Sequence, residues 1–226
     1  MNLIKELFRK ILLQSPIKHY AFYRYEYNFT PSQLSYLLNC LNATKDIKGN
    51  CVEIGCAYGN TTVFLNKHME YSGINKPYIC IDTFTGFTDK DIAYEVQNRD
   101  KTNDMFSTAF LYNSKKRFDQ TMAFNKVTMV TSYQADIKDF DLSRLGEISF
   151  CLFDVDLYHP TITALPQLYQ QLSPGGILII DDCIPDNRFD GAYQAYEEFC
   201  ATNNFTSEIV EEKLGVIRKI SETQGK

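Results

Sequence analysis

The chain has 226 residues, 44% of them hydrophobic, and a formal net charge of −5 at pH 7. This length fits one α/β domain, and a sequence with 16 Phe and 15 Tyr carries too much apolar surface to stay disordered. An acidic chain matches the phosphate backbone of nucleic acid poorly, so nucleic acid is not expected as its partner. No apolar run reaches the roughly 18–20 residues of a membrane-spanning helix, so no transmembrane segment is expected.

Seven cysteines occur without a Cys-x-x-Cys pair and without the Cys/His spacing of a zinc site. Cys51, Cys80 and Cys151 lie in apolar, strand-like runs, where a free thiol behaves as a small hydrophobic side chain. Reduced thiols are typical of the cytoplasm, which is therefore the predicted location.

Residues 1–48 are predicted to form a helical N-terminal extension. Apolar residues at positions 3, 4, 7, 8, 11 and 12 follow the period of an amphipathic helix. Charged residues between them exclude a signal peptide, which needs an unbroken apolar stretch. This helix is expected to pack on the domain or on a second subunit of a homo-oligomer, or to contact a membrane surface. Ser15-Pro16 predicts a break, and Thr30-Pro31 predicts the start of another helix.

Residues 49–226 alternate between short apolar runs and helical segments. Strands are predicted at 51–55, 78–82, 127–131, 149–155 and 176–181, and helices up to about residue 70, over 161–172 and over 190–203. Continuously apolar strands that alternate with helices are typical of a parallel sheet covered on both faces. Residues 205–220 predict an antiparallel hairpin, which completes a Rossmann-like α/β fold with a mostly parallel, seven-stranded sheet.

The polar segment 87–126 is too long for an ordinary connection between a strand and a helix. Long segments at the carboxyl edge of a sheet are commonly lids. The segment is therefore predicted to be a lid or a substrate-facing insertion.

The first strand runs into a glycine loop, CVEIGCAYGNTT (51–62). Gly55 and Gly59 are spaced G-x-x-x-G, which is neither the dinucleotide fingerprint G-x-G-x-x-G nor a P-loop. Glu53 favours a ligand with a positive group, and Asp82 is placed to accept hydrogen bonds from the two hydroxyls of a ribose. Together they indicate S-adenosylmethionine, which has an amino group and a ribose; the alternative is an ordinary tight turn.

Two further strands end in pairs of acids, Asp154 and Asp156 after the fourth strand and Asp181 and Asp182 after the fifth. The connection between them has room for one helix, so the two carboxyl ends should lie side by side. Asp154 and Asp156 should point to the same side of an extended backbone. Carboxylates gathered in this way repel one another unless a cation lies among them, and Mg²⁺ takes oxygen ligands. Alternatively, Asp156 caps the next helix and the other pair is solvated.

Three stretches resemble known methyltransferases. VEIGCAYGNTT (52–62) resembles motif I of the class I S-adenosylmethionine-dependent enzymes. IDTFTGF (81–87) and DVDLY…PGG…DD (154–182) resemble blocks of the macrocin/mycinamicin/novobiocin-type sugar O-methyltransferases. The resemblance implies a Mg²⁺ or Mn²⁺ ion at Asp154, Asp181 and Asp182, and Asp156 as general base. The cofactor-binding residues that it implies or that lie in these blocks are Glu53, Gly55, Cys56, Tyr58, Gly59, Thr61, Asp82, Thr83, Phe84 and Asp154. Ser132 is a further candidate; it stands after the third strand, where the family usually has a glycine.

Tyr158 and His159 follow the predicted base and are candidate substrate contacts, whereas the two other histidines are interpreted as structural. The predicted function is Mg²⁺-dependent O-methylation of a sugar or a glycosylated small molecule. One alternative is a catechol-type phenolic methyltransferase, although that class typically has Asp-Asn in place of Asp181–Asp182. Another is a non-catalytic binding protein with the same fold, against which the intact acids argue.

Overall fold

The centre of the molecule is a seven-stranded sheet in a computed structural model that describes residues 3–16, 27–106, 109–110, 112–185 and 187–220. Within these residues the strand order is β3-β2-β1-β4-β5-β7-β6. Strands β1 to β5 are parallel, and β7 is antiparallel to both β5 and β6. The predicted fold class is therefore confirmed. The strands are β1 (Asn50–Ile54), β2 (Tyr78–Asp82), β3 (Val130–Gln134), β4 (Ile148–Phe153), β5 (Leu172–Ile180), β6 (Ile209–Val210) and β7 (Leu214–Arg218).

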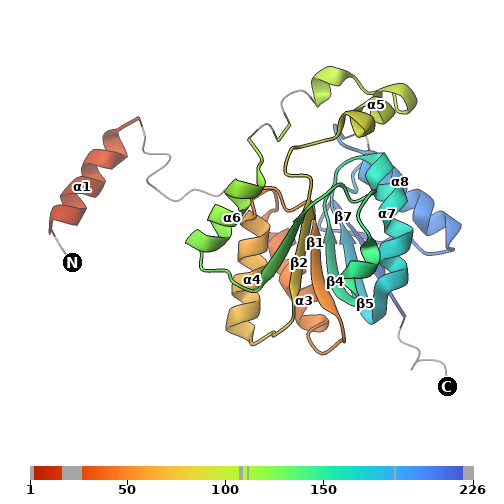
Figure 1. Cartoon of the computed structure of the whole chain (residues 1–226), viewed down its shortest axis with the longest axis horizontal. Helices are drawn as coiled ribbons and strands as arrows, with labels where there is room; N and C mark the ends of the chain where they lie inside the picture. The colour runs from red at the N-terminus through yellow and green to blue at the C-terminus, as the bar shows by residue number, and fades with distance from the viewer. Residues whose placement is uncertain (1–2, 17–26, 107–108, 111, 186, 221–226) are drawn as a thin grey trace.

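Helices cover both faces of the sheet, as Figure 1 shows. One apolar cluster joins the sheet to α7 (Tyr158–Gln171), α8 (Gly191–Thr202) and the short helix η2 (Leu142–Leu145). The other joins it to α3 (Pro31–Ala43), α4 (Asn60–Ser72) and α6 (Lys115–Phe124). Helix α5 (Asp89–Asn98) and the short helix η1 (Asn103–Met105) lie beyond the carboxyl ends of the strands.

Alternate residues of the central strands enter opposite clusters, because successive side chains of a strand point to opposite faces. On β4, Cys151 and Phe153 belong to the cluster under α7 and α8, whereas Phe150 and Leu152 belong to the cluster under α3 and α4. Each such side chain contributes roughly 1.5–3 kcal/mol when fully buried. Burial on both faces explains why these strands read as continuous apolar runs.

The predicted position of the third strand is wrong, because the observed strand begins three residues later. The apolar run 127–131 predicted it, but β3 begins at Val130, which pairs with Tyr78 of β2. Met129 is exposed just before it. Because β3 is the edge strand of the sheet and is only partly buried, hydrophobicity alone does not define its register.

The N-terminal region contains α1 (Leu3–Gln14) and α3 in its described parts; residues 17–26 lie outside them. Helix α1 ends just before Ser15, as predicted, and its Leu7, Phe8 and Ile11 are 60–62% exposed. Its packing on a second subunit or on a membrane stays a prediction. Thr30 caps α3 in a reciprocal pair of hydrogen bonds with Gln33, which confirms the predicted start.

The predicted lid segment forms α5, η1 and α6 in its described parts. Helix α6 buries Phe118 and Met122 against the sheet, so this helix covers part of one face of the sheet. Helix α5 is the part of the segment that borders the sheet edge. The boundaries of the lid and of the N-terminal extension stay predictions.

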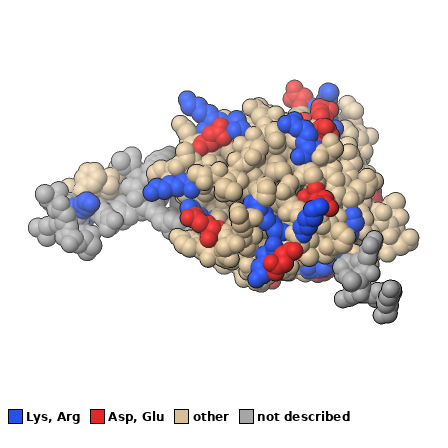
Figure 2. Space-filling view, turned by 60° about the horizontal axis from the view of Figure 1, so that its bottom comes forward, with Lys and Arg blue, Asp and Glu red and all other residues tan. Residues whose placement is uncertain are grey.

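All seven cysteines are free and buried, which confirms the predicted burial of Cys51, Cys80 and Cys151. Among the described residues, no helix is long and apolar enough to cross a membrane. Figure 2 shows basic and acidic side chains interspersed over one face of the molecule, without a continuous basic surface there.

Gly191, the first residue of α8, touches the backbone at the start of α7. A methyl group on Gly191 would lie 2.2 Å from the nitrogen of Tyr158 and 2.7 Å from the carbonyl carbon of Leu157. Neither is a flexible side-chain end, so a larger residue must push the two helices apart.

Gly191→Ala is therefore expected to lower the free energy of unfolding by about 3 kcal/mol or more, because overpacking against backbone cannot relax locally. Gly73→Ala is the matched control: Gly73 has φ 67° but open space around it, so a loss of about 1–2 kcal/mol is expected from backbone strain alone. Urea denaturation followed by circular dichroism measures both. A smaller loss for Gly191→Ala than for Gly73→Ala would contradict this contact.

Candidate functional site

The strand order reverses between β1 and β4, and the backbones there are very close. Asp154 donates its N–H to the carbonyl of Ile54 at 2.8 Å. A methyl group on Gly55 would lie 1.6 Å from the carbonyl oxygen of Asp154, and Gly55 has φ 87°. Glycine is therefore required at this position. Such a reversal point at the carboxyl ends of parallel strands is where open α/β sheets bind ligands.

Two cavities meet at this point. The first, of about 400 Å³, extends from Asp82 and Thr83 past Asp154 to Asp181 and Asp182, and Asp156 also lines it. We call it the main cavity. The second, of about 600 Å³, lies beside the glycine loop and is lined by the predicted cofactor residues Glu53, Cys56, Tyr58 and Thr61. Gly55 and Asp154 line both, so the two cavities meet around these residues.

Asp82 ends β2 and organises the loops around it. One carboxylate oxygen accepts the N–H of Ala57 at 2.8 Å, and the other accepts the N–H of Phe84 at 2.6 Å and the side-chain amide of Asn113 at 3.2 Å. Burial raises the pKa of this carboxyl group, and these hydrogen bonds oppose the shift. Asp82 thus ties the glycine loop to the wall of the main cavity.

Glu53 is fully enclosed within the domain. Its Oε2 accepts hydrogen bonds from the hydroxyls of Thr62 and Tyr78, both at 2.7 Å. Burial raises its pKa to about 7, while these two hydroxyls oppose the rise. The carboxylate therefore anchors helix α4 to β2, in addition to lining the second cavity.

Four carboxyl groups meet at the ends of β4 and β5: Asp154, Asp156, Asp181 and Asp182, called the acid cluster below. Burial, together with the charges of the neighbouring aspartates, raises the pKa of Asp154 and of Asp156 well above the usual range. Burial also raises the pKa of Asp181 to about 6. One oxygen of Asp181, Oδ1, is buried without a hydrogen-bond partner. The expected gathering of acids is therefore present, and its negative charges need positive charge nearby.

Lys213 supplies one positive charge to the acid cluster. Its Nζ lies 2.7 Å from Asp181 Oδ2 and 3.3 Å from Asp182 Oδ1. Burial opposes the charged ammonium, but the two aspartates outweigh it and raise the pKa of Lys213. Among the described residues, no group of three His, Cys, Asp or Glu side chains is already arranged around a metal position.

Asp156 is held by its backbone in an unusual position. Its φ is 61°, a left-handed value that is uncommon outside glycine, so the expected extended geometry is wrong. It does not cap the next helix either: the N-cap of α7 is Leu157, which forms no side-chain cap. Instead, the carbonyl of Asp156 accepts the N–H of Ala192 at 3.0 Å. The peptide after Asp156 is therefore anchored from α8.

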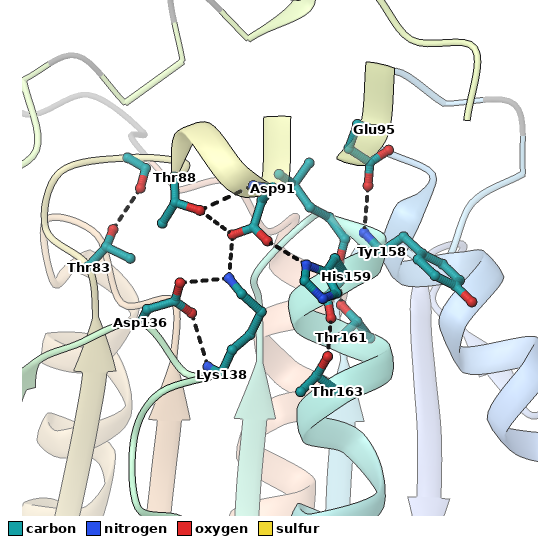
Figure 3. A network of polar contacts seen from close by, with 12 residues as sticks. Thr83, Thr88, Asp91, Glu95, Asp136, Lys138, Tyr158, His159, Thr161 and Thr163 are labelled. Atoms are coloured by element: carbon teal, nitrogen blue, oxygen red, sulfur yellow. Dashed lines mark hydrogen bonds and ion pairs between the residues drawn. The ribbon is translucent and has the colours of Figure 1, made fainter. Parts of the chain in front are cut away.

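Helix α5 anchors the next peptide, between Leu157 and Tyr158 (Figure 3). Glu95 Oε1 accepts the N–H of Tyr158 at 2.7 Å and so supplies the missing cap of α7 from another helix. Glu95 Oε2 lies 2.5 Å from Arg99, whose other guanidinium nitrogen reaches Asp190 at 2.9 Å. The position of α5 and that of the loop carrying Asp156 are thereby coupled.

A second polar group on α5 connects it to the far side of the main cavity (Figure 3). Asp91 Oδ2 accepts hydrogen bonds from Thr88 and Lys138, both at 2.6 Å, and Lys138 also reaches Asp136 at 2.6 Å. Asp91 Oδ1 lies 3.2 Å from His159 Nδ1. Asp91 and Asp136 both line the main cavity, so α5 forms part of its wall.

Several predicted site residues are not brought to either cavity. Ser132 lies in the middle of β3 opposite Cys80, because the strand starts later than predicted; Asp136, just after the strand, takes its place at the cavity. Tyr158 turns to Glu198, and His159 to Asp91. Gly59 and Phe84 pack against α6 instead.

Lys213, Asp91, Glu95 and Asp136 are site residues that were not predicted from the sequence. Lys213 had a usable signal: in the predicted antiparallel hairpin, the start of the last strand must lie beside the end of β5, where Asp181 and Asp182 stand. Asp91 and Glu95 had none, because they lie in a polar segment without a recognisable period.

Residues 31–216 match the family model of the macrocin O-methyltransferases (TylF). No curated protein sequence matches the chain significantly. Among solved structures, the O-methyltransferase NovP has a TM-score of 0.69 at 16% identity, over 95% of this chain and 99% of NovP. The calicheamicin methyltransferase CalS11 has a TM-score of 0.61 at 18% identity, over 94% of this chain and 90% of CalS11.

An rRNA methylase from Streptococcus thermophilus has a TM-score of 0.54 at 16% identity, over 87% of this chain and 100% of the methylase. At such identities these similarities show a shared fold. The same fold therefore serves proteins described by very different acceptors.

Glu95→Ala is expected to lower the free energy of unfolding by about 3 kcal/mol, because it leaves Arg99 without one partner of a buried ion pair and α7 without its cap. Glu95→Gln retains an acceptor for the N–H of Tyr158, so its loss should be clearly smaller. Chemical denaturation of both variants measures the difference. Equal losses would show that the hydrogen bond to α7 contributes nothing.

Proposed function

The chain belongs to the macrocin O-methyltransferase family, and we propose that it transfers the methyl group of S-adenosylmethionine to a hydroxyl of a sugar or a glycosylated small molecule, aided by a divalent cation at the acid cluster. The predicted family and the predicted enzyme class are confirmed by this membership. The acceptor, the cation and the roles of individual residues are our proposal. One observation carries it: a single cavity joins Asp82 to Asp156 and the acid cluster.

The proposed position of S-adenosylmethionine follows the two cavities. Asp82 and Thr83 border the part that we assign to the ribose, since a carboxylate at the end of the second strand suits two adjacent hydroxyls. The second cavity, beside Gly55, Cys56 and Tyr58, is assigned to the methionine part. The methyl group would then lie near Asp154, where the two cavities meet.

The acid cluster fits a divalent cation by its chemistry. Its donors are carboxylate oxygens, which Mg²⁺ and Mn²⁺ prefer, and one of them, Asp181 Oδ1, is buried without a partner. We propose that Asp154, Asp181 and Asp182 hold the ion. When bound, the ion supplies positive charge that lowers the pKa of an acceptor hydroxyl.

Asp156 is proposed as the general base. It lines the main cavity and does not ligate the ion in this proposal. A bound ion would offset the neighbouring aspartates and favour the ionised form of Asp156. The carboxylate would then take the proton of the acceptor hydroxyl while the oxygen forms a bond to the methyl carbon. The carbon–sulfur bond breaks, sulfur keeps the electron pair, and S-adenosylhomocysteine leaves. The contacts of α8 with the carbonyl of Asp156 and of α5 with the N–H of Tyr158 support this role, because proton transfer needs a base in a constant position.

The proposed acceptor is a sugar. CalS11 is also described as a TDP-rhamnose 3′-O-methyltransferase. In this chain, Phe87, Phe110 and Phe189 line the main cavity, with the ring of Phe87 5.2 and 5.4 Å from the other two. Such rings can pack on the apolar face of a sugar.

The same phenylalanines also favour a phenolic acceptor as the second candidate. Parallel assays with a panel of sugar diols and with catechol distinguish the two. Absence of methyl transfer to every acceptor, with the cofactor bound, would favour the non-catalytic alternative.

Asp156→Asn should lower kcat at least about 100-fold, because the amide cannot accept the proton. Binding of S-adenosylhomocysteine, measured by calorimetry, should stay unchanged. Asp89→Asn, which removes an exposed carboxylate of α5, is the matched control and should leave kcat unchanged. Near-wild-type turnover by Asp156→Asn would refute its assignment as base.

Calorimetric titration of Mg²⁺ or Mn²⁺ into protein saturated with S-adenosylhomocysteine tests the cation. We expect saturable binding in the wild type that Asp181→Asn abolishes, since it removes one ligand. Asp89→Asn again serves as the control and should bind like the wild type. Binding that survives Asp181→Asn would place the ion elsewhere, and circular dichroism checks that this variant is folded.

A further inference from the structure

Lys213 places an ammonium group inside the acid cluster. Its side chain is 12% exposed, and its Nζ contacts Asp181 and Asp182. The same Nζ lies 4.8 Å from the ring centre of Phe29, so an aromatic face covers it on another side. Among the described residues that line the main cavity, Lys213 is the one basic side chain.

The sheet itself puts Lys213 there. Strands β5 and β7 are antiparallel, and Ile180 pairs with Gly215. One step further along this ladder, Cys183 donates its N–H to the carbonyl of Lys213 at 2.8 Å. Lys213 therefore stands level with Asp181 and Asp182. The turn before it is tight, with φ 48° at Glu211 and 71° at Glu212. The backbone therefore fixes where the Lys213 side chain starts, while its flexible four-carbon stem leaves the ammonium able to move away from the two carboxylates.

A single ammonium compensates the cluster incompletely. Lys213 contacts Asp181 through Oδ2, while Oδ1 of the same carboxylate has no partner. A divalent cation that binds Asp181 and Asp182 would meet the ammonium at the same carboxylates. Two positive charges a few ångströms apart in a buried site repel strongly, so one must withdraw for the other to bind.

We propose that Lys213 is a tethered counter-ion of the acid cluster, which competes with the divalent cation for Asp181 and Asp182 and thereby sets the affinity for that cation. This inference rests on the cation of the proposed function. In the absence of the cation, Lys213 neutralises part of the cluster and keeps it compact. Binding of the cation has to displace the ammonium from Asp181 Oδ2, so the affinity is lower than that of the carboxylates alone.

The test compares Mn²⁺ binding by wild type, Lys213→Met and Lys213→Arg, with S-adenosylhomocysteine present. Lys213→Met keeps an apolar stem against Phe29 and removes the charge, whereas Lys213→Arg keeps the charge. Free Mn²⁺ is measured by its electron paramagnetic resonance signal. We expect Lys213→Met to lower the Kd for Mn²⁺ about tenfold, the effect of about 1.4 kcal/mol, and Lys213→Arg to leave it nearly unchanged.

Thermal denaturation gives a second readout that needs no activity. Saturating Mn²⁺ should raise the Tm of Lys213→Met more than that of the wild type, because tighter binding to the native state stabilises it more. Lys213→Gln repeats both measurements if Lys213→Met does not fold.

The outcomes separate this inference from the proposed function. Binding that Asp181→Asn abolishes, but with an equal or higher Kd in Lys213→Met, would overturn the competition and leave the cation site standing. Failure of Mn²⁺ to bind to the wild type and to Lys213→Met alike would overturn both the competition and the cation of the proposed function.

Discussion

The constraint on which this structure depends is the repulsion among four buried or partly buried carboxyl groups at one place. Parallel strands β4 and β5 end side by side, so the acids that follow them cannot avoid one another. In a medium of low polarity such a cluster needs protons, a cation or a built-in positive group. Lys213 is the positive group that the chain itself provides to this cluster. The pKa values of Asp154 and Asp156 are raised nevertheless, which indicates that one ammonium does not compensate all four carboxyl groups.

The parts of the fold around the cluster are tied to it by short polar contacts. Glu95 of α5 and Ala192 of α8 anchor the backbone on either side of Leu157, directly after Asp156. Asp91, also on α5, reaches across to Lys138 and Asp136, beside the part of the cavity bordered by Asp82. A single helix of the polar segment 87–126 is therefore bonded to both ends of the main cavity. This explains why buried acids occur on a helix that the sequence suggests is solvated.

The fold could be predicted from sequence wherever both faces of a strand are buried. The runs 51–55 and 78–82 are largely apolar, and the predicted strands there agree with β1 and β2 to within one residue. The half-exposed edge strand β3 begins three residues later than predicted, so Ser132 lies within the strand and not at the site. The gathering of Asp154, Asp156, Asp181 and Asp182 could be predicted because parallel topology alone dictates it. The direction of Tyr158 and His159 could not, because it depends on Glu198 and Asp91, which come from distant segments. The left-handed backbone conformation of Asp156 could not be predicted from the sequence either.

The fold alone does not determine which acceptor is methylated. NovP, CalS11 and an rRNA methylase share this architecture with the chain, so the sheet and its glycine loop are compatible with acceptors of very different size. In this chain, α5 and three phenylalanines contribute walls of the main cavity beyond the strand ends. The sugar proposed as acceptor fits both parts of this cavity, because its hydroxyls can donate to carboxylate oxygens while the C–H face of its ring packs on the phenyl groups.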